Sequence, residues 1–180
     1  VPEINVADKP VLDDAILAEK ETPTGGYGDS LYPYAQQVEK LMSYKVQMQE
    51  YENYRLDFED VLEVVRRVDN QTRGLTKDCY LVGWQFDGHD SAFPDFSTVN
   101  PRHKRSEDAT SLDSLKWLIR EAKEKYNTTV TLHVNLSDAY TDDNDEGAKM
   151  LENGLYMHND DGSVKESGVW AGHSGFIINQ

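Results

Sequence analysis

The stretch Cys79-Tyr80-Leu81-Val82-Gly83-Trp84 is a continuous apolar run near the middle of the 180-residue chain. Such a run is typical of a β-strand that is buried on both faces of a parallel sheet. The sole cysteine, Cys79, begins it, so an internal disulfide is impossible. We interpret Cys79 as a buried strand residue rather than a nucleophile, because its neighbours are apolar.

Helical patterns flank this strand on both sides. The preceding helix begins after Asp57, a suitable N-cap, and has Arg66 and Arg67 in its predicted last turn. The following helix is predicted over residues 112–126. Along each, apolar residues recur at intervals of three and four. They are Phe58, Val61, Leu62, Val65 and Val68 in the first helix, and Leu115, Leu118, Ile119, Ala122 and Tyr126 on the inner face of the second.

Two further predicted strands complete an alternation of strands and helices. Residues 44–48 alternate weakly between apolar and polar side chains, and residues 129–134 follow the second helix. No hairpin turn separates these strands, which is typical of βαβ units on a parallel sheet. We predict an α/β fold of the (β/α)8 TIM-barrel type, of which the chain holds only a part because a whole barrel needs about 250 residues. A doubly wound sheet satisfies the same periodicity.

The predicted organisation divides the chain near residue 43. Residues 1–43 form a polar N-terminal arm with a short helix over residues 33–42, and residues 44–180 form the partial barrel. Within the second part, residues 138–146 are expected to be an acidic loop, and residues 168–180 are a glycine-rich end.

The charge balance excludes some classes of function. The chain has 33 acidic and 18 basic residues, a net charge of −15, which disfavours binding to nucleic acid. It contains no run of about 18 apolar residues, so no membrane insertion is expected. We predict no cofactor, because the sequence has no glycine-rich phosphate loop after a strand and no nucleophile elbow. The first ten residues lack the pattern of a signal peptide.

Polar side chains gather in two loops that follow predicted strands. The carboxyl ends of parallel strands meet at one edge of a sheet, so both loops should lie on one face, with Asp90 and His133 toward a shared cleft. The side chains of these loops suit a hydroxyl-rich ligand, with amides and carboxylates for hydroxyls and an aromatic ring for the C–H face. They are Trp84, Gln85, Asp87, His89, Asp90, His133 and Asn135. A plain turn at Asp87-Gly88 and a core histidine at His133 are the structural alternatives.

A metal site is a weaker interpretation of the same polar residues. Four histidines could combine with nearby aspartates on a barrel, but no His-x-His or His-x-x-x-His pair occurs among them. They are His89, His133, His158 and His173. Residues 142–147 are similar to a calcium loop but have Asn153 where its twelfth-position glutamate would stand. We therefore predict no metal.

Two motifs resemble glycoside hydrolase family 101, the endo-α-N-acetylgalactosaminidases. The run Gly88-His89-Asp90-Ser91 with its ending Pro94-Asp95 is similar to the family's Gly-His-Asp-Ser stretch, which ends in Pro-Asp. The run His133-Val134-Asn135-Leu136-Ser137-Asp138-Ala139-Tyr140 is similar to its His-Val-Asn-x-Ser-Glu-x-Tyr, although Asp138 stands in place of glutamate. The resemblance covers residues 44–140, with one helix between the motifs.

The resemblance implies a secreted or cell-surface retaining endo-glycosidase that releases Gal-β1,3-GalNAc from serine or threonine of mucin-type glycoproteins. Asp90 would then hold galactose hydroxyls, His133 would bind sugar nearby, and Trp170 would cover the sugar, although Val169-Trp170-Ala171 departs from the family's Gly-Trp-Asn-Trp. The family's catalytic aspartate and glutamate lie on later strands, which we expect from the remaining part of the barrel in the same protein.

Alternatives of other classes stay open beside this resemblance. Retaining hydrolysis needs two carboxylates about 5–5.5 Å apart. Asp87, Asp90, Asp95 and Asp138 could in principle provide such a pair, but the resemblance assigns them to binding and structure. The other hypotheses are a non-catalytic carbohydrate-binding module and a metal-dependent TIM-barrel hydrolase.

Overall fold

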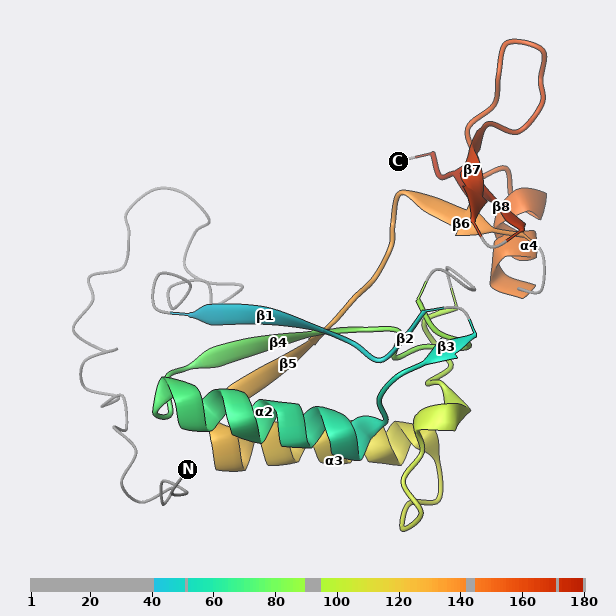
Figure 1. The fold of residues 1–180 in the computed structure, drawn as a ribbon. Helices are drawn as coiled ribbons and strands as arrows, with labels where there is room; N and C mark the ends of the chain where they lie inside the picture. Colours follow the sequence, from blue (N-terminus) through green and yellow to red (C-terminus); the bar gives the residue numbers. More distant parts are fainter. Residues whose placement is uncertain (1–40, 51, 90–94, 142–144, 171, 180) are drawn as a thin grey trace, which may run out of the picture.

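The structure, a computed structural model, describes residues 41–180 apart from 51, 90–94, 142–144, 171 and 180. A parallel sheet with two helices comes first, and a small antiparallel sheet with one helix follows (Figure 1). The elements of the first part are β1 (Met42–Gln47), β2 (Gln49–Glu50), β3 (Asn53–Tyr54), α2 (Phe58–Thr72), β4 (Lys77–Val82), the 3₁₀ turn η4 (Pro101–His103), α3 (Ser111–Tyr126) and β5 (Thr128–Leu132). Those of the second part are β6 (Asp138–Tyr140), α4 (Asp145–Glu152), β7 (Glu166–Trp170) and β8 (His173–Ile177).

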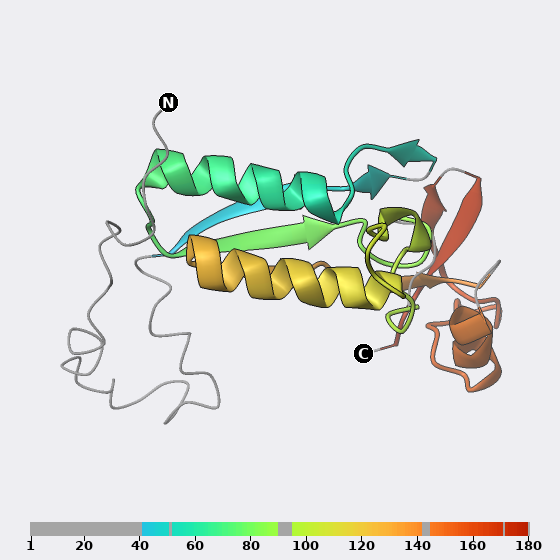
Figure 2. The same ribbon diagram turned by 90° about the horizontal axis from the view of Figure 1, so that it is seen from below.

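The parallel sheet has the order β1-β4-β5, with Tyr44 opposite Cys79 and Cys79 opposite Val130. Figures 1 and 2 show α2 and α3 side by side on one face of this sheet. Sequential strand order with both crossover helices on one face is shared by a segment of a (β/α) barrel and by one half of a doubly wound sheet. The α/β class and the three predicted strands are confirmed.

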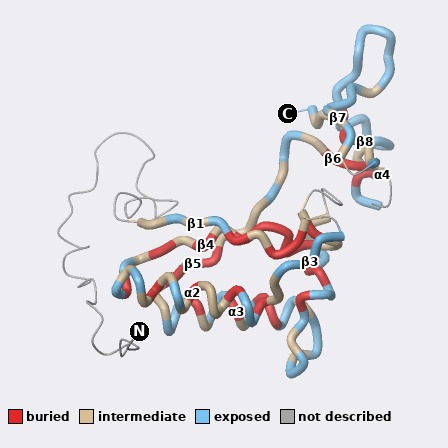
Figure 3. The backbone as a smooth tube through the Cα atoms, in the orientation of Figure 1, coloured by how far each residue is buried: buried red, intermediate tan, exposed pale blue. Residues whose placement is uncertain are grey.

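The core lies between the sheet and the two helices, where Figure 3 shows the facing sides of the elements buried. Cys79 is completely buried in β4, as predicted. Its burial raises the pKa of the thiol to about 12, so the thiolate nucleophile is disfavoured at neutral pH. The buried members from the other elements are Val46, Met48, Phe58, Val61, Val65, Leu81, Trp84, Val99, Leu115, Leu118, Ala122 and Val130.

A buried ion pair lies at the end of the parallel sheet that is opposite to the predicted site. Lys77 Nζ lies 2.7 Å from Asp69 Oδ1 at the start of β4, with both side chains almost completely buried. The ammonium also donates to the carbonyl of Leu75. Each charge is therefore compensated, which a buried ion pair requires.

Both long helices begin as the sequence predicts. Asp57 caps α2 and Thr110 caps α3, each with a reciprocal bond to the residue three positions on. The predicted end of α2 is wrong, because the helix continues to Thr72 and closes at Arg73 with a left-handed φ of 54°. Arg66 and Arg67 thus lie in its interior.

Two further boundary predictions differ from the structure. Ile119, expected on the inner face of α3, is 37% exposed, because the neighbouring Leu118 takes the buried direction. Most of the helix predicted over residues 33–42 lies outside the described residues, which begin at residue 41. Met42 begins β1 instead, because it pairs with Lys77 of β4. The proposed division near residue 43 stays a prediction.

Regular secondary structure occupies much of the segment after β5, where the sequence analysis predicted an acidic loop and a glycine-rich end. Asp138 begins β6 and Asp145 begins α4, within the predicted acidic loop. Strands β6, β8 and β7 pair antiparallel in that order, with Ala139 opposite Phe176. Figures 1 and 2 place this small sheet beyond the carboxyl end of the parallel sheet. No helix in the described part of the chain is long and apolar enough to cross a bilayer.

Candidate functional site

The loops that follow β4 and β5 meet at one end of the parallel sheet. The backbone nitrogen of His133 donates to the carbonyl of Leu81 at 2.9 Å, and Trp84 Nε1 donates to the His133 carbonyl at 2.8 Å. The rings of His89 and His133 have centroids 5.1 Å apart. The prediction that the two loops share one face is confirmed for these residues.

Asp90 lies outside the described residues, together with residues 91–94. Its predicted contact with the sugar and its approach to His133 therefore stay predictions. The residues on either side of this gap, His89 and Asp95, are both described.

Trp84 and Gln85 lie under the loop rather than on its surface. Trp84 is 5% exposed and packs in the core, while its indole nitrogen holds the His133 carbonyl. Gln85 is 2% exposed, its backbone bridges to Val99, and its Nε2 has no hydrogen-bond acceptor among the described residues. Both side chains are placed to support the loop that carries His89.

Gln49, which the sequence analysis missed, ties this loop to the end of β1. Its Nε2 donates to the carbonyl of Asp87 at 2.9 Å, and its carbonyl accepts from the backbone nitrogen of His89 at 3.1 Å. Its Oε1 accepts from Asn100 Nδ2 at 3.1 Å. A signal in the sequence was available, since Gln49 follows a third predicted strand and so belongs to the same edge of the sheet.

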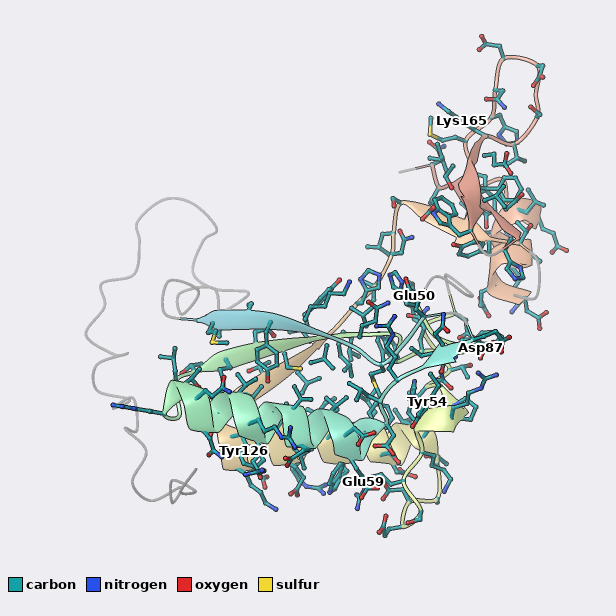
Figure 4. All side chains as sticks on the ribbon, in the orientation of Figure 1. Glu50, Tyr54, Glu59, Asp87, Tyr126 and Lys165 are labelled. Atoms are coloured by element: carbon teal, nitrogen blue, oxygen red, sulfur yellow. The ribbon has the colours of Figure 1, made fainter. Side chains whose placement is uncertain are left out.

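Asp87 is half-exposed beside this buried amide. Its carboxylate lies 3.4 Å from an Arg102 guanidinium nitrogen and 3.5 Å from Gln49 Nε2. Figure 4 shows Asp87 and Glu50 at this end of the molecule. Asp87 is thus part of a hydrogen-bonded and charged group that borders the loop.

The other predicted residues after β5 serve the connection to the second sheet. Asn135 Oδ1 accepts from Ser137 N at 3.0 Å and from Ser137 Oγ at 2.8 Å, which makes a local turn. Its Nδ2 donates to Asp138, whose other oxygen accepts from Ser167 Oγ at 2.9 Å. The structure therefore groups Asn135 with the first strand of the small sheet.

Trp170 lies on β7 of the small sheet. Its ring meets Tyr140 edge to face with centroids 6.3 Å apart, and it covers Gly168 and Gly175, where a side chain would collide with it. The described contacts group Trp170 with this sheet, which lies beyond the carboxyl end of β4 and β5 (Figure 1).

Two aromatic partners, the half-buried Tyr80 and the buried His103, were also missed by the sequence analysis. Tyr80 on β4 bonds through its hydroxyl to His133 Nδ1. His103 in η4 is completely buried and bonds through Nε2 to the Gly83 carbonyl at 3.1 Å. Alternation along β4 places Tyr80 on the face opposite the helices, which would have marked it as a candidate.

The charges around His133 favour its neutral form. Burial lowers the pKa of His133, and the nearby His89 and Lys45 lower it further. A neutral imidazole has one donor and one acceptor nitrogen, and it suits hydrogen bonding to hydroxyl groups. Within the described part of the chain, no group of three or more His, Cys, Asp or Glu side chains could hold a metal ion.

The chain is similar to known glycoside hydrolases. A family model described as endo-alpha-N-acetylgalactosaminidase matches residues 30–162. The alpha-N-acetylgalactosaminidase NagBb from Bifidobacterium bifidum, solved with GalNAc, has a TM-score of 0.63 at 16% identity, over 81% of this chain and 24% of that chain. An alpha-amylase from Lactobacillus plantarum has a TM-score of 0.55 at 18% identity, over 80% of this chain and 33% of that chain.

These structural likenesses establish the fold, and the chain spans about a quarter of the length of NagBb. The family match extends over both motif loops and well over half of the sequence. The chain therefore belongs to the endo-α-N-acetylgalactosaminidase family, glycoside hydrolase family 101.

Proposed function

We propose that this chain forms the first part of the catalytic barrel of a retaining endo-α-N-acetylgalactosaminidase that acts on mucin-type O-linked glycans. The observation that carries the proposal is the meeting of the two motif loops, with the His89 and His133 rings 5.1 Å apart. Family membership supports the substrate class, and the sequential order β1-β4-β5 supports barrel closure by strands of the same polypeptide. An extracellular location is part of this proposal.

In this function the loops at the ends of β4 and β5 bind the sugar. Asp90 and His133 bind its hydroxyl groups, His89 lies beside His133, and Trp170 covers the sugar from the small sheet. Such groups hold the substrate in place, and catalysis requires additional groups that stabilise the transition state more than the bound sugar.

The described carboxylates of this region are engaged by protein groups, which supports a structural role rather than a catalytic one. Asp95 Oδ1 accepts three bonds, from the nitrogen and hydroxyl of Ser97 and from the nitrogen of Thr98, at 2.9–3.1 Å. Asp87 is engaged by Gln49 and Arg102, and Asp138 by Asn135 and Ser167. A retaining glycosidase needs a nucleophile and a proton donor facing the glycosidic bond.

The experiment compares release of an aryl α-glycoside of Gal-β1,3-GalNAc by this chain and by the full gene product. We expect no turnover from the 180-residue chain and turnover from the full product. In the full product, Asp90→Ala should lower kcat/KM by an amount equivalent to about 2–4 kcal/mol, as for a charged hydrogen-bonding group removed from a binding site.

The matched control is Asp160→Ala, the same chemical change on the exposed segment between α4 and β7, which should keep the wild-type rate. Turnover by the 180-residue chain alone would mean that a carboxylate pair within it is catalytic. Absence of turnover from the full product, with retained binding of the disaccharide, would favour the non-catalytic binding module.

A further inference from the structure

Tyr80 and His133 form a pair on the face of the sheet that α2 and α3 leave uncovered. Parallel pairing sets Tyr80 opposite Thr131 and Leu81 opposite Leu132, so His133 follows one residue past the end of β5. The Tyr80 hydroxyl bonds to His133 Nδ1, and the two rings stand perpendicular with centroids 5.5 Å apart. The hydroxyl therefore contacts the imidazole at its Nδ1 edge.

The backbone of His133 is held independently of this bond. Its nitrogen donates to Leu81 at 2.9 Å and its carbonyl accepts from Trp84 Nε1 at 2.8 Å. With the backbone secured at both ends, the remaining freedom of the side chain is rotation of the ring and choice of tautomer. Tyr80 acts on both of these.

We propose that Tyr80 is a positioning residue that keeps neutral His133 in the tautomer with its proton on Nε2. A phenol O–H is a stronger acid than an imidazole N–H, so Tyr80 donates to Nδ1 and the ring proton resides on the other nitrogen. His133 then offers a directed N–H donor to a sugar oxygen. This last step rests on the proposed function, in which His133 contacts the sugar.

The surroundings of the pair keep the ring neutral, which the assignment of a single tautomer requires. Lys45 lies opposite Tyr80 in the neighbouring strand β1, and His89 lies beside His133. Both disfavour a second positive charge at this place, as does partial burial of the imidazole.

The test reads the tautomer directly by nitrogen-15 NMR of histidine-labelled chain at neutral pH. The His133 signal is assigned by its loss in His133→Gln. We expect the Nε2–H pattern in the wild type and a mixture of tautomers in Tyr80→Phe, which keeps the ring and removes only the hydroxyl. Tyr54→Phe is the matched control, since Tyr54 packs on His103 and should leave His133 unchanged.

A proton on Nδ1 in the wild type, or an unchanged tautomer in a folded Tyr80→Phe, would overturn the proposal. Thermal melting and the amide spectrum establish that the variant is folded. The sugar contribution is measured separately by titration with Gal-β1,3-GalNAc, where Tyr80→Phe should weaken binding about twofold, because only part of a tautomer mixture carries the donor on Nε2.

Different results would contradict the contact of His133 with the sugar and the proposed function. Equal affinity of wild type and Tyr80→Phe, despite an altered tautomer, would show that His133 does not donate to the sugar. No binding by the wild type, with the Nε2–H tautomer intact, would contradict the proposed function and leave the role of Tyr80 in place.

Discussion

His103 is the buried residue whose charge state bears most directly on the candidate loop. It lies between Tyr54, stacked at 5.4 Å, and Phe58, edge to face at 5.7 Å, and its Nε2 donates to the Gly83 carbonyl. Its Nδ1 is buried with no hydrogen-bond partner among the described residues. Protonation would place a charge there without an acceptor, so burial lowers the pKa of His103 to about 4.

This lowered pKa predicts a pH dependence of stability. The unfolded chain binds the proton near pH 6.5 and the folded chain only near pH 4, so the folded state is favoured fully above about pH 6.5. As the pH falls from 6.5 to 4, the free energy of unfolding should drop by about 3 kcal/mol through this residue. Urea unfolding at several pH values measures it.

The comparison variant is His103→Gln, whose amide can still donate to Gly83 but does not titrate. Its unfolding free energy should fall less steeply over this range, because the contribution of His103 is removed and only those of the other titratable groups, such as His133, remain. Parallel pH curves for the wild type and the variant would show that the pKa of His103 is not lowered in the folded state.

At the scale of elements, the loop after β4 is shaped by its contact with the strand that begins at Gln49. Gly83 has a φ of 80°, and a Cβ there would stand 2.8 Å from the Gln49 nitrogen and nearer still to its carbonyl oxygen. Gly88 has a φ of 109° and would place a Cβ 2.9 Å from Gln49 Cγ. Two glycines therefore allow the loop to pack against Gln49, whose side-chain amide donates to Asp87 and whose backbone carbonyl accepts from His89 N.

We predict that Gly83→Ala is far more destabilising than an alanine in a comparable backbone conformation elsewhere. Gly154 after α4 has a φ of 67° and open space around its Cβ position, so Gly154→Ala should cost only the left-handed penalty of about 1–2 kcal/mol. Gly83→Ala adds a backbone collision and should exceed that by at least about 2 kcal/mol. Denaturant unfolding of both variants provides the measurement.

A similar loss in the two variants would show that the 83–89 loop shifts away from Gln49 at little cost. In that case the contacts of Gln49 with Asp87 and His89 would not determine the loop conformation. The amide signals of His89 in the Gly83→Ala spectrum would distinguish a local shift from global destabilisation.

At the scale of the whole molecule, the net charge of −15 acts on every approaching ligand. A neutral disaccharide experiences little of this field, whereas an anionic glycan is repelled, and salt screens the repulsion over about 10 Å at 0.1 M. Charge therefore favours neutral over acidic glycans without any dedicated contact.

We predict that the affinity for neutral Gal-β1,3-GalNAc is insensitive to salt. The sialylated form should bind more weakly at low salt, and the difference should narrow as salt increases. Calorimetric titration of both glycans across a salt series measures this, with uncharged lactose as a control for general salt effects. Tighter binding of the sialylated glycan than of the neutral glycan at low salt would indicate a positively charged group at the binding site.

The sequence by itself determined the layered part of the molecule. Buried strands such as β4 (Lys77–Val82) and capped amphipathic helices follow from hydrophobic periodicity and local bonds, which are properties of neighbouring residues. Strand order also follows, since short βαβ connections leave few alternatives. For the same reason, the meeting of the Gly83 and His133 loops was predictable.

Only the tertiary structure decided which side chains support that meeting. Gln49, Tyr80 and His103 bond to residues 20–53 positions away. Their positions along the predicted strands mark Gln49 and Tyr80 as candidates, but no local pattern identifies the partners of these three residues. The tertiary structure also decided the antiparallel pairing of β6, β7 and β8. These strands are short and half-exposed, and they form only because they pair with one another. Local periodicity identifies elements, whereas partners distant in sequence determine the contacts of a site.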